Sequence, residues 1–224
     1  HIGLYEWLVM PFGLSNAPAT CERLMEQLFQ GLQWNGVLVY LDDLVAYGEN
    51  WHQALNRLRL VFLKLREANL TLKPSKCFLM TRETEYLGHR VCAEGIFPGQ
   101  RKIEAVRHWP VPTSIDEVRS FLGLTGYYRK FVKNYAELAH PLVSLMKKGM
   151  KYEWGPAQQS AYERLREALV LYPCLGAIRP EGRLILDTDA SDYAVGAVLS
   201  QVQDGLERVL GYFSRTLNDA QTRY

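Results

Sequence analysis

Val37-Leu38-Val39-Tyr40-Leu41-Asp42-Asp43-Leu44-Val45-Ala46-Tyr47 places two adjacent carboxylates between two apolar, β-branched runs. Such runs predict two short strands, and the acids between them predict a tight hairpin turn. Two-residue hairpin turns usually contain Asn-Gly or Asp-Gly, because they need positive φ angles. Asp42-Asp43 offers no glycine and brings two like charges together, which costs energy unless a cation neutralises them. The pair therefore has two interpretations, a solvated acidic turn or a divalent-cation site.

Helix and strand signals flank this hairpin. Residues 13–18 predict a turn that leads into a helix, with Asn16 as its N-cap and a proline in its first turn. Asn50, followed three residues later by glutamine, predicts the start of a second helix. Residues 70–72 and 86–91 are apolar enough to predict short strands.

The second half of the chain is first helical and then rich in strands. Ser114 begins a capping box for a third helix, which Gly123 and Gly126 are expected to break or bend. Pro156 predicts the start of a fourth helix that runs to about Val170. Three strands of a further sheet are expected at residues 184–186, 195–199 and 209–213.

Positive charge is concentrated in the middle of the chain. The 224 residues carry a net charge of only +2, yet the segment from Arg101 to Glu153 contains ten Lys or Arg against five acids. Four tyrosines lie among these charges, a composition that suits phosphate contacts combined with base or sugar packing. The alternative is a solvated helix surface with its aromatic residues in the core. These tyrosines are Tyr127, Tyr128, Tyr135 and Tyr152.

Several classes of protein are disfavoured by composition. The four cysteines are scattered without a C-x-x-C pair and the five histidines lack ligand spacing, which argues against a zinc site. Unpatterned cysteines suit an intracellular protein. No apolar run is long enough to span a membrane, so no membrane partner is expected. The chain begins without Met, and we expect it to be a piece of a longer protein.

The block YEWLVMPFGLSNAPAT at residues 5–20, followed by Tyr40-Leu41-Asp42-Asp43, closely resembles the reverse transcriptases of gypsy-class LTR retrotransposons. Nearly the whole chain carries the motifs of this family in order, so it resembles the reverse transcriptase/RNase H region of a Pol polyprotein. The other matching segments are residues 72–77, 86–89, 121–131 and 187–192.

The resemblance implies an α+β (mixed α/β) fold with three parts. Residues 1–97 would be a partial polymerase palm, residues 98–180 a helical thumb and connection, and residues 181–224 the start of an RNase H-like sheet. Because so short a piece cannot complete an RNase H domain, its strands are expected to be poorly ordered or to pack on the connection.

The resemblance also implies catalytic and metal-binding residues. Asp42 and Asp43 would be the palm ligands for Mg²⁺ or Mn²⁺ in two-metal chemistry. Asp189 would be the first carboxylate of a retroviral-type RNase H site, which also uses two metals. An isolated aspartate at a strand end is otherwise most often a turn residue.

Five further residues are implied as binding residues. Phe12 and Gly13 would lie beside the incoming nucleotide and template, although the same block is also a capped helix start. Lys76 would lie near the triphosphate as a general acid, although single lysines are usually solvated. Leu87 and Gly88 would form the loop that holds the primer end, or alternatively an ordinary strand and turn.

The implied function is RNA-directed DNA synthesis, in which a dNTP is joined to a primer 3′ hydroxyl on an RNA or DNA template. The parent Pol polyprotein would act inside the cell, in a cytoplasmic particle or the nucleus. The family places another essential aspartate upstream of this segment, and the remaining RNase H acids downstream. The isolated chain is therefore expected to be inactive.

Two alternatives to an active polymerase segment stay open at this point. The chain could be a catalytically dead remnant, or a co-opted nucleic-acid-binding or structural module, since its basic middle could bind a hybrid without catalysis. An unrelated two-metal nuclease is the other alternative, and it leaves the middle region unexplained.

Overall fold

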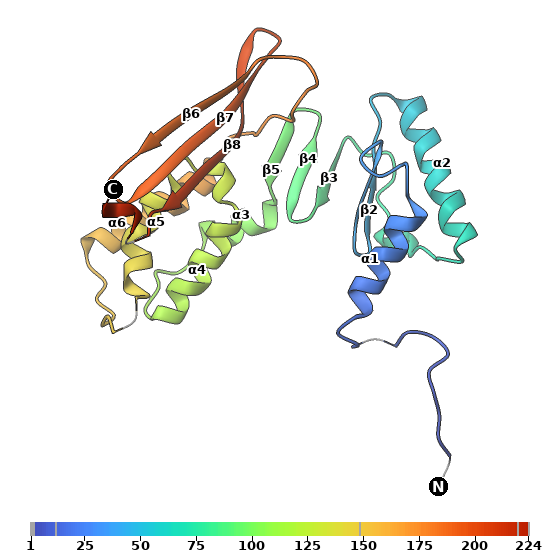
Figure 1. Ribbon diagram of the computed structural model, residues 1–224, viewed down its shortest axis with the longest axis horizontal. Helices are drawn as coiled ribbons and strands as arrows, with labels where there is room; N and C mark the ends of the chain where they lie inside the picture. The colour runs from blue at the N-terminus through green and yellow to red at the C-terminus, as the bar shows by residue number, and fades with distance from the viewer. Residues whose placement is uncertain (1–2, 12, 148, 219, 224) are drawn as a thin grey trace. The chain divides into compact units, whose positions relative to one another are not determined.

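The computed structural model describes residues 3–11, 13–147, 149–218 and 220–223 (Figure 1). Its contacts divide the chain into two compact units, His1–Thr81 and Arg82–Tyr224. Helices and strands occur in both units, which confirms the predicted mixed α/β class. Within the described ranges, no helix is both long and apolar enough to cross a membrane.

The first unit is a β-hairpin packed against two helices through one small core. Val37 and Val39 are buried and alternate along the first strand, as expected for a hairpin with one covered face. Met25 reaches this core from the first helix, and Phe29 reaches it from the position directly after that helix. The elements are α1 (Ala17–Leu28), β1 (Val37–Tyr40), β2 (Asp43–Ala46), α2 (Trp51–Glu67) and the 3₁₀ helix η1 (Pro74–Lys76).

The helix signals of this unit are largely confirmed. The Asn50 side chain accepts the backbone N–H of Gln53 at 2.9 Å and so caps α2 as predicted. Asn16 precedes α1, but its side chain makes no capping hydrogen bond. Residues 70–72 form no strand, which corrects the prediction.

The hairpin turn lies one residue earlier than predicted. Tyr40 pairs with Asp43, so the turn consists of Leu41 and Asp42, and Asp43 already belongs to β2. Leu41 has a φ of 53°, a conformation that costs a residue with a Cβ about 1–2 kcal/mol. The sequence pattern missed this register because leucine is not a usual residue for positive φ.

The second unit combines a small meander, a helical bundle and a larger antiparallel sheet. The meander is β3 (Glu83–Tyr86), β4 (His89–Cys92) and β5 (Gly95–Pro98), and the larger sheet is β6 (Leu184–Ala190), β7 (Ala194–Gln203) and β8 (Leu206–Thr216). Between them lie α3 (Gln100–Arg107), α4 (Ile115–Tyr127), η2 (Arg129–Phe131), α5 (Tyr135–Leu145) and α6 (Pro156–Val170), and η3 (Gln221–Arg223) follows β8.

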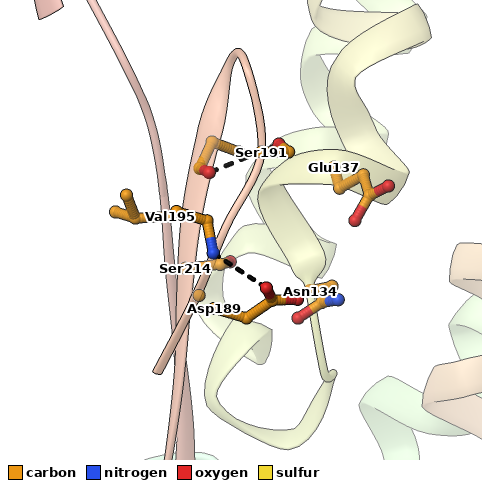
Figure 2. Close-up of a pocket in the computed structure, with 9 residues that line it drawn as sticks. Asn134, Glu137, Asp189, Ser191, Val195 and Ser214 are labelled. Carbon is orange, nitrogen blue, oxygen red and sulfur yellow. Dashed lines mark hydrogen bonds between the residues drawn. The ribbon is translucent and has the colours of Figure 1, made fainter. Parts of the chain in front are cut away.

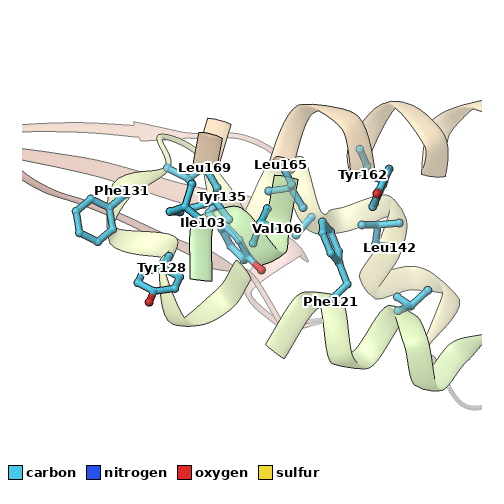
Figure 3. Close-up of a cluster of buried hydrophobic side chains, with 14 of the residues drawn as sticks. Ile103, Val106, Phe121, Tyr128, Phe131, Tyr135, Leu142, Tyr162, Leu165 and Leu169 are labelled. Atoms are coloured by element: carbon cyan, nitrogen blue, oxygen red, sulfur yellow. The ribbon is translucent and has the colours of Figure 1, made fainter. Parts of the chain in front are cut away.

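One hydrophobic core joins the helices of this unit. Phe121, Leu142 and Leu165 are fully buried at its centre, and Tyr162 packs beside Phe121 with ring centroids 5.0 Å apart (Figure 3). Residues of the meander and of β8 pack against the same cluster. The sheet of residues 83–98 thus belongs to the second unit, whereas the predicted palm extended to residue 97.

Several predicted elements of the second unit have the expected positions. The Ser114 hydroxyl accepts the N–H of Glu117 at the start of α4, and α6 begins at Pro156. Strands occupy all three of the predicted C-terminal positions. Helix α4 continues through Gly123 and Gly126 to Tyr127, so the predicted break is wrong.

The larger sheet packs on the helical part of the unit, which is the second of the two expected outcomes. The Arg129 guanidinium donates to the Ser214 carbonyl of β8. The Ser214 hydroxyl in turn accepts the Ala136 N–H of α5 at 2.9 Å. These bonds join η2 and α5 to β8.

Candidate functional site

Asp42 and Asp43 stand at the tip of the β1–β2 hairpin, and both are exposed. Within the described residues, neither carboxylate has a hydrogen bond or ion pair. Adjacent free carboxylates on a short hairpin offer oxygen ligands without first breaking other bonds. This arrangement suits a hard divalent cation.

Glu22 of α1 holds the turn that carries these aspartates. Its carboxylate accepts the backbone N–H of Leu41, and the Cys21 thiol lies 3.9 Å from the Leu41 carbonyl oxygen. Glu22 lies three residues before buried Met25, on the helix face toward the hairpin. Sequence reasoning missed this role, and its only signal was an acid at helical spacing among apolar residues.

The donor set of the hairpin fits Mg²⁺ in type. Mg²⁺ is usually bound by one or two carboxylates while its other positions keep water or substrate phosphates. Asp42 and Asp43 supply such carboxylates. Over the described part of the chain, no group of three or more His, Cys, Asp or Glu could hold a metal ion.

Of the other predicted nucleotide-binding residues, the structure describes Gly13 and Lys76. Phe12 is outside the described residues. Gly13 is exposed with a φ of 90°, and among the described residues beyond its chain neighbours no atom lies within 4 Å of the position its Cβ would take. Lys76 is exposed at the end of η1. In the ranges described, neither Gly13 nor Lys76 is hydrogen-bonded or ion-paired to Asp42 or Asp43.

Leu87 and Gly88 form the two-residue turn between β3 and β4, not part of a strand as residues 86–91 predicted. Their φ angles are 49° and 71°, and two positive φ values are typical of a type I′ hairpin turn. The Leu87 carbonyl accepts the Tyr127 hydroxyl at 2.5 Å, and the Gly88 carbonyl accepts the Tyr128 hydroxyl at 2.7 Å. Both turn residues stay exposed.

His89 follows the turn and is only 8% exposed. Its Nδ1 lies 2.8 Å from the Leu87 carbonyl oxygen, which can only accept, so Nδ1 carries a proton. Nε2 is buried and has no hydrogen-bond partner among the residues that the structure describes. Burial lowers the pKa of His89, the bond to Leu87 opposes this, and the charge of Lys130 lowers the pKa further. The ring is therefore kept neutral.

Asp189 lies in β6, paired with Gly196 of β7. Its Oδ1 accepts the N–H of Ala190 at 2.9 Å. Figure 2 shows Asp189 beside Asn134 in a small pocket between the sheet and α5, with Glu137 further along the helix. Glu137 is thus an acid near Asp189 that the sequence did not single out.

The basic segment is mostly exposed, whereas its tyrosines divide between surface and core. Tyr128 and Tyr135 are buried, but Tyr127 is 53% exposed beside the Leu87–Gly88 turn. Some of the charge is paired, as in Arg107 with Glu104 on α3. The core interpretation therefore holds for Tyr128 and Tyr135, whereas contacts of the exposed residues to nucleic acid stay a prediction.

Two families match the sequence. Residues 2–91 match "Reverse transcriptase (RNA-dependent DNA polymerase)". Residues 154–224 match "RNase H-like domain found in reverse transcriptase", which begins before the predicted start at residue 181. The chain is thus a reverse transcriptase region joined to an RNase H-like domain.

The full-length relatives are transposon polyproteins. The chain is 44% identical over 223 residues to the retrovirus-related Pol polyprotein from transposon 297 of Drosophila melanogaster. This match covers 99% of the chain and 21% of that protein. It is 34% identical to the transposon Tf2-3 polyprotein of Schizosaccharomyces pombe, covering 99% of the chain and 17% of that protein. The chain belongs to the Pol polyproteins of retrotransposons, and the predicted gypsy-class relationship is confirmed. It spans about one fifth of the length of these relatives.

Solved structures of a foamy viral protease-reverse transcriptase share the fold. One, designated dRH and in complex with ds DNA, has a TM-score of 0.85 at 25% identity and covers 97% of this chain and 38% of that chain. Another, in complex with an RNA/DNA hybrid, has a TM-score of 0.81 at 25% identity and covers 97% and 29%.

Proposed function

We propose that this segment supplies part of the catalytic centre for RNA-directed DNA synthesis by its parent Pol polyprotein. The reaction is nucleotidyl transfer from a dNTP to a primer 3′ hydroxyl on an RNA or DNA template. The observation that carries the proposal is the exposed Asp42–Asp43 pair at the tip of a hairpin whose turn is held by Glu22. The reverse transcriptase match over residues 2–91 supports it.

In this proposal Asp42 and Asp43 are ligands for Mg²⁺, or for Mn²⁺ in its place. Such an ion, when bound, lowers the pKa of the attacking hydroxyl and neutralises charge on the leaving pyrophosphate. The chain itself contributes position, because the β1–β2 hairpin presents both carboxylates and its turn is fixed to α1. Preorganised charge of this kind acts without reorganisation during the reaction.

The binding residues have separate roles in the same proposal. Phe12 and Gly13 lie beside the incoming nucleotide and template, and Lys76 acts near the triphosphate as a general acid. Leu87 and Gly88 hold the primer end. The glycine allows the backbone to approach the primer closely.

The RNase H-like part carries a second proposed activity of the parent protein. Asp189 serves there as the first metal-binding carboxylate for cleavage of the RNA strand of a hybrid. Its exposure at the edge of a pocket supports this role. The remaining ligands would come from other parts of the polyprotein.

Nucleic-acid binding by the basic segment is the third element of the proposal. The foamy viral relatives were solved with ds DNA and with an RNA/DNA hybrid. Exposed charges such as Lys102 and Lys133 suit contacts to phosphates. Affinity should therefore fall steeply with salt and depend little on sequence.

This basic segment also favours a second candidate function, binding of a hybrid without catalysis. A chain that acts only in this way binds an RNA/DNA hybrid in a salt-dependent manner. It extends no primer, even within its full-length polyprotein.

The test uses the polymerase of the full-length parent protein with a primed RNA template and Mg²⁺. Asp42→Asn should lower primer extension about 10³-fold or more and leave RNA cleavage intact. Asp189→Asn should do the reverse, so each variant is the folding control for the other. Asp192→Asn, three residues along the same segment, should change neither activity.

Two outcomes would contradict the proposal. A parent protein that binds hybrid but never extends a primer would support the binding function instead. Equal extension by the wild-type protein and Asp42→Asn would remove the hairpin from the catalytic centre. The isolated chain should extend no primer, because its described residues bring no third carboxylate to the Asp42–Asp43 pair for two-metal chemistry.

A further inference from the structure

Two neighbouring tyrosines at the end of α4 reach two successive carbonyls of the Leu87–Gly88 turn. Tyr127 donates to the Leu87 carbonyl at 2.5 Å, and Tyr128 donates to the Gly88 carbonyl at 2.7 Å. Each bond joins residues 40 positions apart in the chain. These two hydrogen bonds therefore connect the turn to α4. The hydrogen bonds within the β3–β4 hairpin do not reach this helix.

A second donor occupies each of these carbonyls. His89 Nδ1 donates to the Leu87 oxygen at 2.8 Å, and the Gly99 N–H donates to the Gly88 oxygen at 2.8 Å. A carbonyl oxygen has two lone pairs, so both acceptors are fully used. Neither peptide group can rotate without losing hydrogen bonds.

Packing reinforces these bonds on the inner side of the turn. The His89 ring lies 5.4 Å from the Tyr127 ring and 5.6 Å from the Tyr128 ring, measured between centroids. Gly99 approaches so closely that a Cβ there would lie 2.5 Å from the Gly88 oxygen. The outer side is open, since Leu87 is 37% exposed.

We propose that Tyr127 and Tyr128 are positioning residues that fix the Leu87–Gly88 turn to α4, so that the turn and the helix move as one body. Whether this body positions a primer end rests on the proposed function of the turn. The attachment itself is a property of the second unit alone. It leaves the exposed face of the turn free to meet a nucleic acid.

Amide hydrogen exchange of the isolated chain tests the attachment directly. Tyr127→Phe and Tyr128→Phe each remove one hydroxyl and should speed exchange of the amides at residues 86–90 about 5-fold, and the double variant about 30-fold. Tyr152→Phe is the matched control, because Tyr152 donates to the Pro112 carbonyl at 2.5 Å in the same unit. Tyr152→Phe should not change the rate of amide exchange at residues 86–90.

The exchange result decides the attachment whatever the chain's activity. Unchanged exchange at residues 86–90 in the double variant overturns the proposal. An equal change in Tyr152→Phe also overturns it, since the effect would then be a general loss of stability.

Primer extension by the full-length polymerase tests the positioning role. The double variant should lower kcat about 10-fold or more, with an unchanged KM for dNTP and unchanged affinity for the hybrid, because only the primer end is misplaced. An unchanged kcat, or a matching loss in Tyr152→Phe, overturns positioning. If the wild-type polymerase extends no primer, the proposed function fails and positioning of a primer fails with it, while exchange still decides the attachment.

Discussion

Replacing Glu22 by alanine is expected to destabilise the hairpin that carries Asp42 and Asp43. The half-buried Glu22 carboxylate accepts the N–H of Leu41 at a turn position with a φ of 53°. That positive φ is unfavourable for leucine, so the turn depends on contacts that hold it in place. Alanine offers the Leu41 N–H no acceptor.

The size of the effect follows from the type of bond that is lost. A hydrogen bond to a charged acceptor contributes about 1.5–3 kcal/mol, and partial exposure of Glu22 reduces this to about 1–2 kcal/mol. For a unit of the size of His1–Thr81, each 1 kcal/mol shifts Tm by about 4–8 °C. We therefore expect Tm to fall by about 5–15 °C. Glu22→Gln keeps an acceptor oxygen and should lose about half as much.

Calorimetry of the isolated chain measures this shift in the transition of the first unit. Glu26→Ala is the matched control, one turn further along α1, where the side chain is exposed and has no hydrogen bond within the described residues. Both substitutions change helix propensity equally. If Glu22→Ala and Glu26→Ala shift Tm by the same amount, Glu22 does not hold the turn.

Three further predictions concern the second unit. Gly99→Ala should lower its free energy of unfolding by about 1–3 kcal/mol, because the new Cβ would lie 2.5 Å from the Gly88 oxygen; an unchanged urea midpoint would refute this. Gly123→Ala should raise that free energy by about 0.5–1 kcal/mol, since its Cβ meets open space on α4; a lower midpoint would contradict it. Burial lowers the pKa of His89 below 6.5, so the unfolded chain takes up its proton at higher pH and Tm should fall as pH drops from 7.5 to 5.5. The charge of Lys130 acts in the same direction, and His89→Phe should flatten the dependence; an identical slope in that variant would exclude His89 as its source.

Local signals in the sequence predicted much of the fold. Each helix-start signal involves only a few neighbouring residues, and the helices begin where these signals lie. The signals are the caps Asn50 and Ser114 and the first-turn residue Pro156. The break predicted at Gly123 and Gly126 is absent from α4, because tertiary contacts outweigh helix propensity. The intervening part of α4 is fixed by buried Thr125, whose hydroxyl lies 2.9 Å from that of Tyr135.

The candidate site was predicted in part for the same reason. Asp42 and Asp43 can be recognised from the sequence alone, because they are adjacent acids between two apolar runs. Glu22 acts on a turn 19 residues away, and Tyr127 and Tyr128 act over 40 residues. Such long-range partners leave no local pattern, so only the folded chain identifies them. The roles of Asp189, Lys76 and the other binding residues stay predictions.

The Ser214 hydroxyl has a consequence for the order in which the chain folds during synthesis. Ala136 lies in the first turn of α5, where a backbone N–H has no acceptor within the helix. Its acceptor is Ser214, which the ribosome adds 78 residues later. At about 5–20 residues per second, α5 waits several seconds for this partner. The helical part of the second unit therefore reaches its final stability only after β8 has been translated and has folded back onto it.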